Sequence, residues 1–296
     1  MRVLIHYRHF PVAMGRYIQW ALENLGYQVV SCGMYSGGKI PWGDNFYYPN
    51  YKMPPDIVLP DIAEYSLKDV VKDQKFDFII QAGDVAYLTG KTSCPNIIIA
   101  TDPHCVDYHP RLKDADVFVS MQKYYLKDYQ NGVWLPYGYD ENIHKFESQE
   151  IKYDVVFCGL QYPHRIATLE KIKEQGLKVY SGLGLIYREF VSKYNEGKIA
   201  FNWSSKKDLP ARFWEGLAMK RLVLTNRVPD LQEIDLVEDR DYVAFSDETE
   251  AIEKAKYYSS HDSEAEKIAL SGYEHVRPHT YTNHVKKMLE DVWSQL

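Results

Sequence analysis

The sequence predicts an α/β protein with parallel sheets. Apolar runs of strand length alternate with amphipathic segments of helix length, and 296 residues exceed the usual size of one domain. A fresh strand pattern also follows a polar stretch near residue 150. We therefore expect an N-terminal Rossmann-like domain over residues 1–140 and a C-terminal one over residues 150–296, with the option that the last helix returns to the N-terminal domain.

The first half opens with a strand at residues 3–7 and a helix at residues 15–25. In that helix Ile18, Leu22 and Leu25 recur at helical spacing, and Gly26 ends it. Residues 34–60 are rich in Gly, Pro, Tyr and Asn without periodicity, so we interpret them as a long loop. Apolar runs predict further strands at 28–31, 78–81, 96–100, 117–120 and 132–135.

The second half opens with a strand at residues 153–158. Asp208 is a plausible N-cap for a helix at 210–219, whose buried face carries Phe213 and Leu217. The remaining pattern predicts helices at 165–174 and 187–194, strands at 178–180, 198–202 and 222–225, and two C-terminal helices.

The charge of the chain indicates which partners are disfavoured, and its cysteines indicate the cellular compartment. A formal charge of -6 and a pI near 5.9 disfavour a nucleic-acid or anionic-membrane partner. The four cysteines form no CxxC pair, which is typical of reduced thiols. Because no apolar run reaches membrane-spanning length and the chain enters a strand pattern at once, we expect a cytoplasmic protein without a membrane span.

The densest candidate site begins at Asn202, where a strand ends and a polar loop leads into a helix. Parallel sheets hold ligands at this edge, because the free N–H groups of the helix favour phosphate. Arg212 could bind a diphosphate, and Glu215 could accept hydrogen bonds from ribose hydroxyls. Spacing alone leaves open the alternative of an exposed Arg212–Glu215 ion pair.

The order of these residues resembles the C-terminal domain of the CgeB-like glycosyltransferases. That family carries an Asn after a strand, an arginine and a glutamate on the next helix, and a strand ending in Thr, here Thr225. The resemblance covers most of residues 153–293, including the strand and glycine turn at 153–159 and the stretch 269–281. Residues 135–140 also match the linker that precedes this domain.

The resemblance implies a GT-B fold, in which two Rossmann-like domains face a central cleft and the C-terminal one holds a nucleotide-sugar. It places Glu215 on the ribose and Arg212, near Thr225, on the diphosphate or sugar. Arg165 is a second phosphate candidate, with a solvated arginine at a helix start as the alternative. The donor-binding residues implied are Gly159, Arg165, Asn202, Arg212, Glu215 and Thr225.

One position departs from the pattern of many retaining GT-B enzymes. They carry two glutamates eight positions apart, whereas the residue eight before Glu215 is Lys207, with Asp208 one step away. The sugar-side carboxylate is therefore missing or displaced. Retention or inversion at the anomeric carbon stays open.

The N-terminal domain should present the acceptor and, for an inverting enzyme, a general base. Asp102 and His104 follow a predicted strand and are the catalytic candidates, against the alternative of a hydrogen-bonded loop. Irregular spacing of the possible ligands around them argues against a metal site. Further cleft candidates are Gly15 and Arg16 in a loop with one glycine, Asp84 after the strand at 78–81, and His279 and Tyr281 near the end of the resemblance.

The sequence is best explained as a metal-independent glycosyltransferase that needs no cofactor beyond its donor substrate. By default, we expect the donor to be a UDP-sugar and the transferred group to be a hexose. The acceptor is unidentified: a protein, a polysaccharide, a small molecule or, less readily, a modified nucleic-acid base. The alternatives are a nucleotide-sugar epimerase or hydrolase, and a non-catalytic protein that binds a glycan or nucleotide on a degenerate GT-B scaffold.

Overall fold

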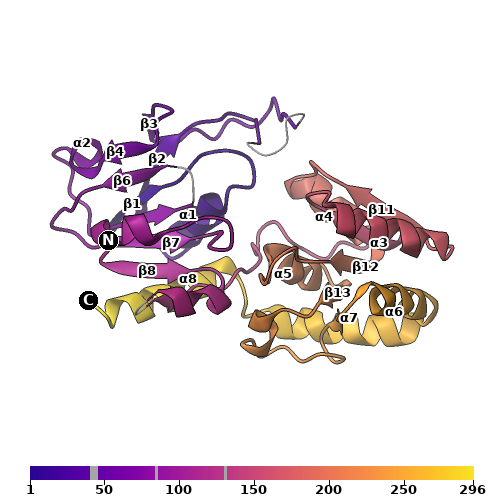
Figure 1. Cartoon of the computed structure of the whole chain (residues 1–296). Coiled ribbons are helices and arrows are strands. Elements are labelled where there is room, and N and C mark those ends of the chain that lie inside the picture. Colours follow the sequence, from indigo (N-terminus) through magenta and orange to yellow (C-terminus); the bar gives the residue numbers. More distant parts are fainter. Residues whose placement is uncertain (41–45, 84–85, 130–131) are drawn as a thin grey trace. The chain divides into compact units, whose positions relative to one another are not determined.

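The computed structural model describes residues 1–40, 46–83, 86–129 and 132–296. These residues form two compact units (Figure 1). Unit 1 combines Met1–Pro136 with Tyr281–Leu296, and unit 2 is Tyr137–Thr280. Both units contain parallel sheets, which confirms the predicted α/β class.

Unit 1 is built on a parallel sheet with the strand order β3-β2-β1-β5-β7-β8-β9. A second, two-stranded sheet pairs β4 with β6. The strands are β1 Arg2–His6, β2 Gln28–Met34, β3 Ile57–Leu59, β4 Glu64–Ser66, β5 Phe78–Ala82, β6 Tyr87–Thr89, β7 Asn96–Ala100, β8 Val117–Ser120 and β9 Val133–Trp134, and the helices are α1 Met14–Asn24, α2 Leu67–Val71, η1 His109–Asp114, η2 Lys123–Asp128 and α8 Tyr281–Trp293.

Helix α8 belongs to unit 1 although it follows the whole of unit 2 in sequence (Figure 1, yellow). Tyr281 stacks on Tyr17 of α1 at 5.2 Å between ring centroids, and Trp293 meets Phe78 of β5 edge-on at 5.1 Å. The apolar face of α8 is buried through Tyr281, Val285, Met288, Leu289 and Val292.

Unit 2 is built on one parallel sheet with the order β11-β10-β12-β13-β14. Its strands are β10 Tyr153–Cys158, β11 Val179–Gly182, β12 Gly197–Asn202, β13 Leu222–Asn226 and β14 Val243–Phe245, and its helices are α3 Pro163–Glu174, α4 Tyr187–Asn195, α5 Ala211–Ala218, η3 Pro229–Gln232, α6 Glu248–Ser260 and α7 Asp262–Val276.

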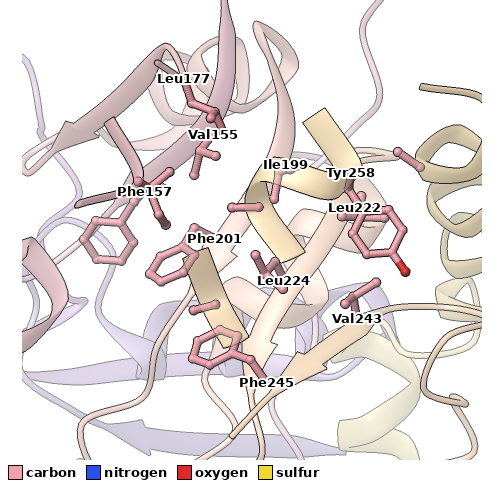
Figure 2. Packing of buried hydrophobic residues seen from close by; sticks show 14 of the residues in the cluster. Val155, Phe157, Leu177, Ile199, Phe201, Leu222, Leu224, Val243, Phe245 and Tyr258 are labelled. Atoms are coloured by element: carbon pink, nitrogen blue, oxygen red, sulfur yellow. The ribbon is translucent and has the colours of Figure 1, made fainter. Parts of the chain in front are cut away.

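Alternate residues of four neighbouring strands form the core of unit 2 (Figure 2). Successive side chains of a strand point to opposite faces, so residues two apart share one face. Phe201 stacks on Phe245 at 5.7 Å between centroids, and Tyr258 of α6 closes the cluster. The strand pairs that contribute are Val155 and Phe157, Ile199 and Phe201, Leu222 and Leu224, and Val243 and Phe245.

Two predictions about helices are wrong. The C-terminal segment contains three helices, because α6 ends before His261 and α7 ends before Arg277. Asp208 is not an N-cap, since α5 has Pro210 at that position. The proline disfavours a helical backbone at Leu209, so the helix cannot begin earlier.

Candidate functional site

The strand order of unit 2 reverses at β10, which lies between β11 and β12. Parallel α/β sheets bind ligands at such a reversal, beyond the carboxyl ends of the strands. Cys158 ends β10 and Asn202 ends β12, so the residues that follow them form the expected position of a site.

Arg212, in the first turn of α5, is fixed across this edge of the sheet. Its Nε donates to the carbonyl of Cys158 at 2.8 Å, and its Nη1 donates to Oδ1 of Asn202 at 2.9 Å. The side-chain amide of Asn202 in turn donates to Oγ1 of Thr225 at 2.8 Å. Asn202 and Thr225 are buried. Three predicted donor residues thus form one hydrogen-bonded chain across β10, β12 and β13.

Gly159 makes room for this arginine. A Cβ at that position would lie 2.4 Å from Nη2 of Arg212. Within the described parts of the chain, Nη2 has no hydrogen-bond acceptor. The guanidinium is therefore held by two of its nitrogens and retains donor capacity.

Arg165 lies beside this chain and is buried. Its Nε and Nη2 donate to the carbonyl of Trp203, and its Nη1 donates to the carbonyl of Leu160 at 2.6 Å. Burial, with a smaller contribution from the nearby charge of Arg212, lowers its pKa to about 10. The alternative of a solvated arginine is wrong, because the guanidinium joins the loops that follow β10 and β12.

Glu215, one turn further along α5, faces His144. The distance from its Oε1 to Nε2 of His144 is 3.4 Å, and both side chains are buried. The backbone N–H of Asp140 donates to Nδ1 of His144 at 3.0 Å. A neutral imidazole that accepts at Nδ1 carries its proton on Nε2, so His144 presents a donor to Glu215.

Burial sets the ionisation of this pair. It raises the pKa of Glu215 to about 7, with Arg212 acting in the opposite direction, and it lowers the pKa of His144 to about 3. The alternative of an exposed Arg212–Glu215 ion pair is wrong, because Glu215 is buried against His144. The sequence reasoning missed His144, although the Asp140-x3-His144 spacing is that of one turn.

Asp208 reaches the same region from the loop between β12 and α5. Its Oδ1 is buried and makes no hydrogen bond with any described residue, while its charge acts on Arg165. Lys207, at the position of the glutamate in the retaining pattern, is exposed. The carboxylate nearest to that position therefore belongs to Asp208.

In unit 1, Asp102 and His104 lie in the loop after β7. The hydroxyl of Thr101 donates to the carboxylate of Asp102 at 3.1 Å, and the N–H groups of Cys105 and Val106 donate to its carbonyl. The loop is therefore hydrogen-bonded, as in the alternative to a catalytic role. Nδ1 of His104 lies 3.0 Å from Oε1 of Gln122, which is buried and which the sequence reasoning missed.

The orientation of the Gln122 amide determines which ring nitrogen of His104 donates. An amide oxygen only accepts, so Nδ1 donates and the lone pair of the neutral ring lies on Nε2. In the part of the chain that the structure describes, Nε2 of His104 makes no hydrogen bond. That arrangement suits a proton acceptor.

Gly15 and Arg16 have structural contacts of their own. A Cβ on Gly15 would lie 2.2 Å from Cγ of Tyr7, so the glycine permits close packing of α1. Arg16 is buried, and its Nη2 donates to Nδ1 of His9 at 3.1 Å and to the carbonyl of Met53 at 2.9 Å.

The remaining cleft candidates belong to different units or lie outside the described residues. His279 lies in unit 2, where Nε2 is 2.9 Å from a carboxylate oxygen of Asp235. Tyr281 begins α8 in unit 1 and is buried against Tyr17. Asp84 lies outside the described residues.

A further polar cluster, which sequence reasoning missed, lies where the strand order of unit 1 reverses between β1 and β5. Arg111 donates from Nη1 to the carbonyl of Gly83 at 2.8 Å, and its guanidinium lies over the rings of Tyr87 and Tyr108, at 4.7 and 4.9 Å. Burial, with a smaller contribution from the charge of Arg111, lowers the pKa of His6 at the end of β1 to about 3.

A family model described as glycosyl transferase-like matches residues 143–290, half of the chain. The chain belongs to the glycosyl transferase-like family. The match covers the whole Arg212–Asn202–Thr225 chain of hydrogen bonds and the Glu215–His144 pair. None of the curated proteins shows significant sequence similarity to this glycosyl transferase-like protein.

Solved structures of similar fold are GT-B glycosyltransferases. An alpha-glucosyltransferase in complex with UDP-glucose and DNA has a TM-score of 0.68 at 11% identity, covering 99% of both chains. Anabaena HepE in complex with UDP and glucose has a TM-score of 0.68 at 11% identity, covering 100% of both chains. Sucrose-phosphate synthase from Thermosynechococcus elongatus has a TM-score of 0.64 at 12% identity, covering 99% of this chain and 98% of its own.

Two kinds of feature are absent from the described residues. None of their helices combines the length and apolar character that crossing a bilayer requires. Their His, Cys, Asp and Glu side chains form no group of three that could hold a metal ion.

Proposed function

We propose that this protein transfers a hexose from a UDP-sugar to an acceptor hydroxyl without a metal ion. The observation that carries the proposal is the hydrogen-bonded chain from Arg212 through Asn202 to Thr225, at the point where the strand order of unit 2 reverses. A fixed guanidinium with a donor to spare, at the start of a helix, suits a diphosphate leaving group.

Glu215 is proposed to bind the ribose. It lies one turn along α5 from Arg212, and a carboxylate can accept both vicinal hydroxyl protons of a ribose. The donor of His144 keeps Glu215 in place on the side away from the ligand. UDP is the proposed nucleotide because the similar alpha-glucosyltransferase and HepE structures hold UDP-glucose, or UDP and glucose.

His104 and Asp102 are proposed on the acceptor side, with His104 as the proton acceptor through Nε2. The CgeB-like resemblance and a cytoplasmic location stay part of the proposal, and the latter is supported by four free cysteines. The acceptor is proposed only as a hydroxyl compound.

A thermal-shift screen of the purified protein against UDP, GDP, ADP and TDP tests the donor site. We expect UDP to raise the melting temperature and the shift to vanish in Glu215→Ala, because a ligand stabilises the state that binds it. A Glu253→Ala variant, which removes an exposed glutamate from α6, should keep the shift. No shift with any nucleotide would refute the donor site.

Slow release of glucose from UDP-glucose then separates an enzyme from a binding protein. We expect hydrolysis in the absence of acceptor, with loss of turnover in Arg212→Ala. Tight binding of UDP-glucose without any turnover would favour the non-catalytic alternative.

A further inference from the structure

A depression lies in unit 2 at the edge of the sheet opposite to the Arg212 chain. It has a volume of about 710 Å³, within the range of small-molecule sites. Lys198 of β12 and Arg221 before β13 line it from the amino ends of these strands, and the first turns of α7 form another wall. Along β12, Lys198 and Asn202 are four residues apart, a length of roughly 13 Å, so the two sites are separate.

One of the residues that line the depression is a buried cation. Arg221 is buried, donating from Nε to the carbonyl of Met219 at 2.9 Å and from Nη1 to the carbonyl of Gly197 at 2.8 Å. No carboxylate of the described residues lies within ion-pair distance of it. Burial lowers its pKa to about 10, still well above neutrality. A buried cation without a counter-ion is costly and favours an anion.

The lining carries an excess of positive charge in an otherwise acidic chain. Lys198 is neutralised by Asp262 at 2.7 Å. Among the described residues, the other charged groups of the lining form no ion pair with one another. They are three cations, Lys220, Arg221 and Lys267, which we name the basic patch, and one anion, Glu266. Three positive charges and one negative charge give these groups a net charge of +2.

Apolar side chains border the basic patch. Phe146, Ile151 and Leu270, which we name the apolar rim, are 40%, 42% and 46% exposed. The cations of Lys220 and Arg221 lie 5.1 and 5.3 Å from the centre of the Phe146 ring. Lys220 follows the end of α5 at a φ of 56°, a position that glycine usually occupies.

We propose that this depression binds a small organic phosphate. A phosphate monoester carries close to two negative charges at neutral pH, which matches the unpaired charge of the lining. The basic patch binds the phosphate oxygens, with Arg221 as a planar donor. The apolar rim covers the organic group. The site is independent of the proposed donor site and of the proposed transfer reaction.

Phenyl phosphate is the probe, measured on the full chain by thermal shift. At about five times its dissociation constant we expect a rise in melting temperature of about 2 °C. Inorganic phosphate should give a smaller rise because it lacks the apolar group, and benzamide should give none because it lacks the charge. Absence of a rise with phenyl phosphate would overturn the proposal.

Variants locate the binding. The double variant Lys220→Ala with Lys267→Ala should lose the rise, whereas Lys256→Ala, an exposed lysine of α6, should keep it. Glu266→Gln should tighten binding about twofold to threefold by removing the one opposing charge. Lys220 and Lys267 are only partly buried or exposed, so these changes leave the core intact.

Saturating UDP and the Glu215→Ala variant separate this site from the donor site. Phenyl phosphate should stabilise the protein equally with and without UDP, and Glu215→Ala should retain the effect. Competition by UDP, or a rise that persists in the double lysine variant, would overturn the assignment. Failure of UDP to bind would affect the proposed function alone.

Discussion

The ionisation of Glu215 couples the candidate site to stability. Its pKa is about 7 in the folded protein against an ordinary value of 4.5. Between these values the folded state binds more protons than the unfolded state. Neutral Glu215 therefore makes its full contribution to the free energy of unfolding below pH 4.5. This contribution, up to about 3 kcal/mol, is lost as the pH rises through 7.

Glu215→Gln should remove this loss, because an amide does not ionise. As the pH rises from 5 to 8, the free energy of unfolding should increase in the variant relative to the wild type. The measurement is urea unfolding at each pH. Glu253→Gln, which changes an exposed glutamate on α6, is the control. Parallel pH profiles for Glu215→Gln and the wild type would contradict the burial argument.

His144 acts in a lower pH range with the opposite sign. Its pKa falls from 6.5 to about 3, so the unfolded state binds the extra proton and stability is lost as the pH falls below 6.5. We expect the free energy of unfolding to fall less between pH 7 and pH 5 in His144→Gln than in the wild type. His261→Gln replaces an exposed histidine and should keep the wild-type profile.

Residue contacts were only partly predictable from the sequence. The resemblance named Arg212, Asn202 and Thr225, and the structure joins them by hydrogen bonds, although their binding of a donor stays a prediction. His144 was not predictable because it meets Glu215 only through the fold, from 71 positions away.

At the scale of single elements, the turn after β10 determines where Arg212 can lie. Gly159→Ala would place a methyl group against Nη2 of the guanidinium. We expect UDP affinity to fall about tenfold, equivalent to about 1.4 kcal/mol, measured by calorimetric titration. Gly176→Ala is the matched control, since Gly176 also has a positive φ but no atom within 4 Å of the position that a methyl group would take. Equal affinities in both variants would refute the role of Gly159.

Strands with a strongly apolar sequence were predicted well, whereas β3, β4 and β6 were not. The strands at 96–100, 117–120 and 153–158 have the predicted bounds because each contains three or four consecutive apolar residues. β3, β4 and β6 have three residues each, too few to show a period of two. The N-cap at Asp208 failed because the Leu209–Pro210 step outweighs the capping preference.

At the scale of the whole molecule, unit 1 depends on a helix that follows unit 2 in sequence. Met288 of α8 is fully buried. We expect Met288→Ala to cost about 2–5 kcal/mol and to increase hydrogen exchange throughout unit 1. Amides of unit 2 should keep their protection, because its core is formed within Tyr137–Thr280.

Lys286→Ala, an exposed change on the same helix, should leave both units protected. Equal loss of protection in both units after Met288→Ala would show that they unfold together. The measurement is hydrogen exchange followed by mass spectrometry of peptides from each unit.

The discontinuity of unit 1 also fixes an order of events on the ribosome. Synthesis proceeds from the N-terminus, and the first part of a chain usually folds first. Here residues 1–136 emerge early but lack α8, whereas residues 137–280 emerge as a complete unit. We therefore expect the later-made unit to reach its native state first, leaving the apolar surface of α1 open to chaperones until residues 281–296 are released.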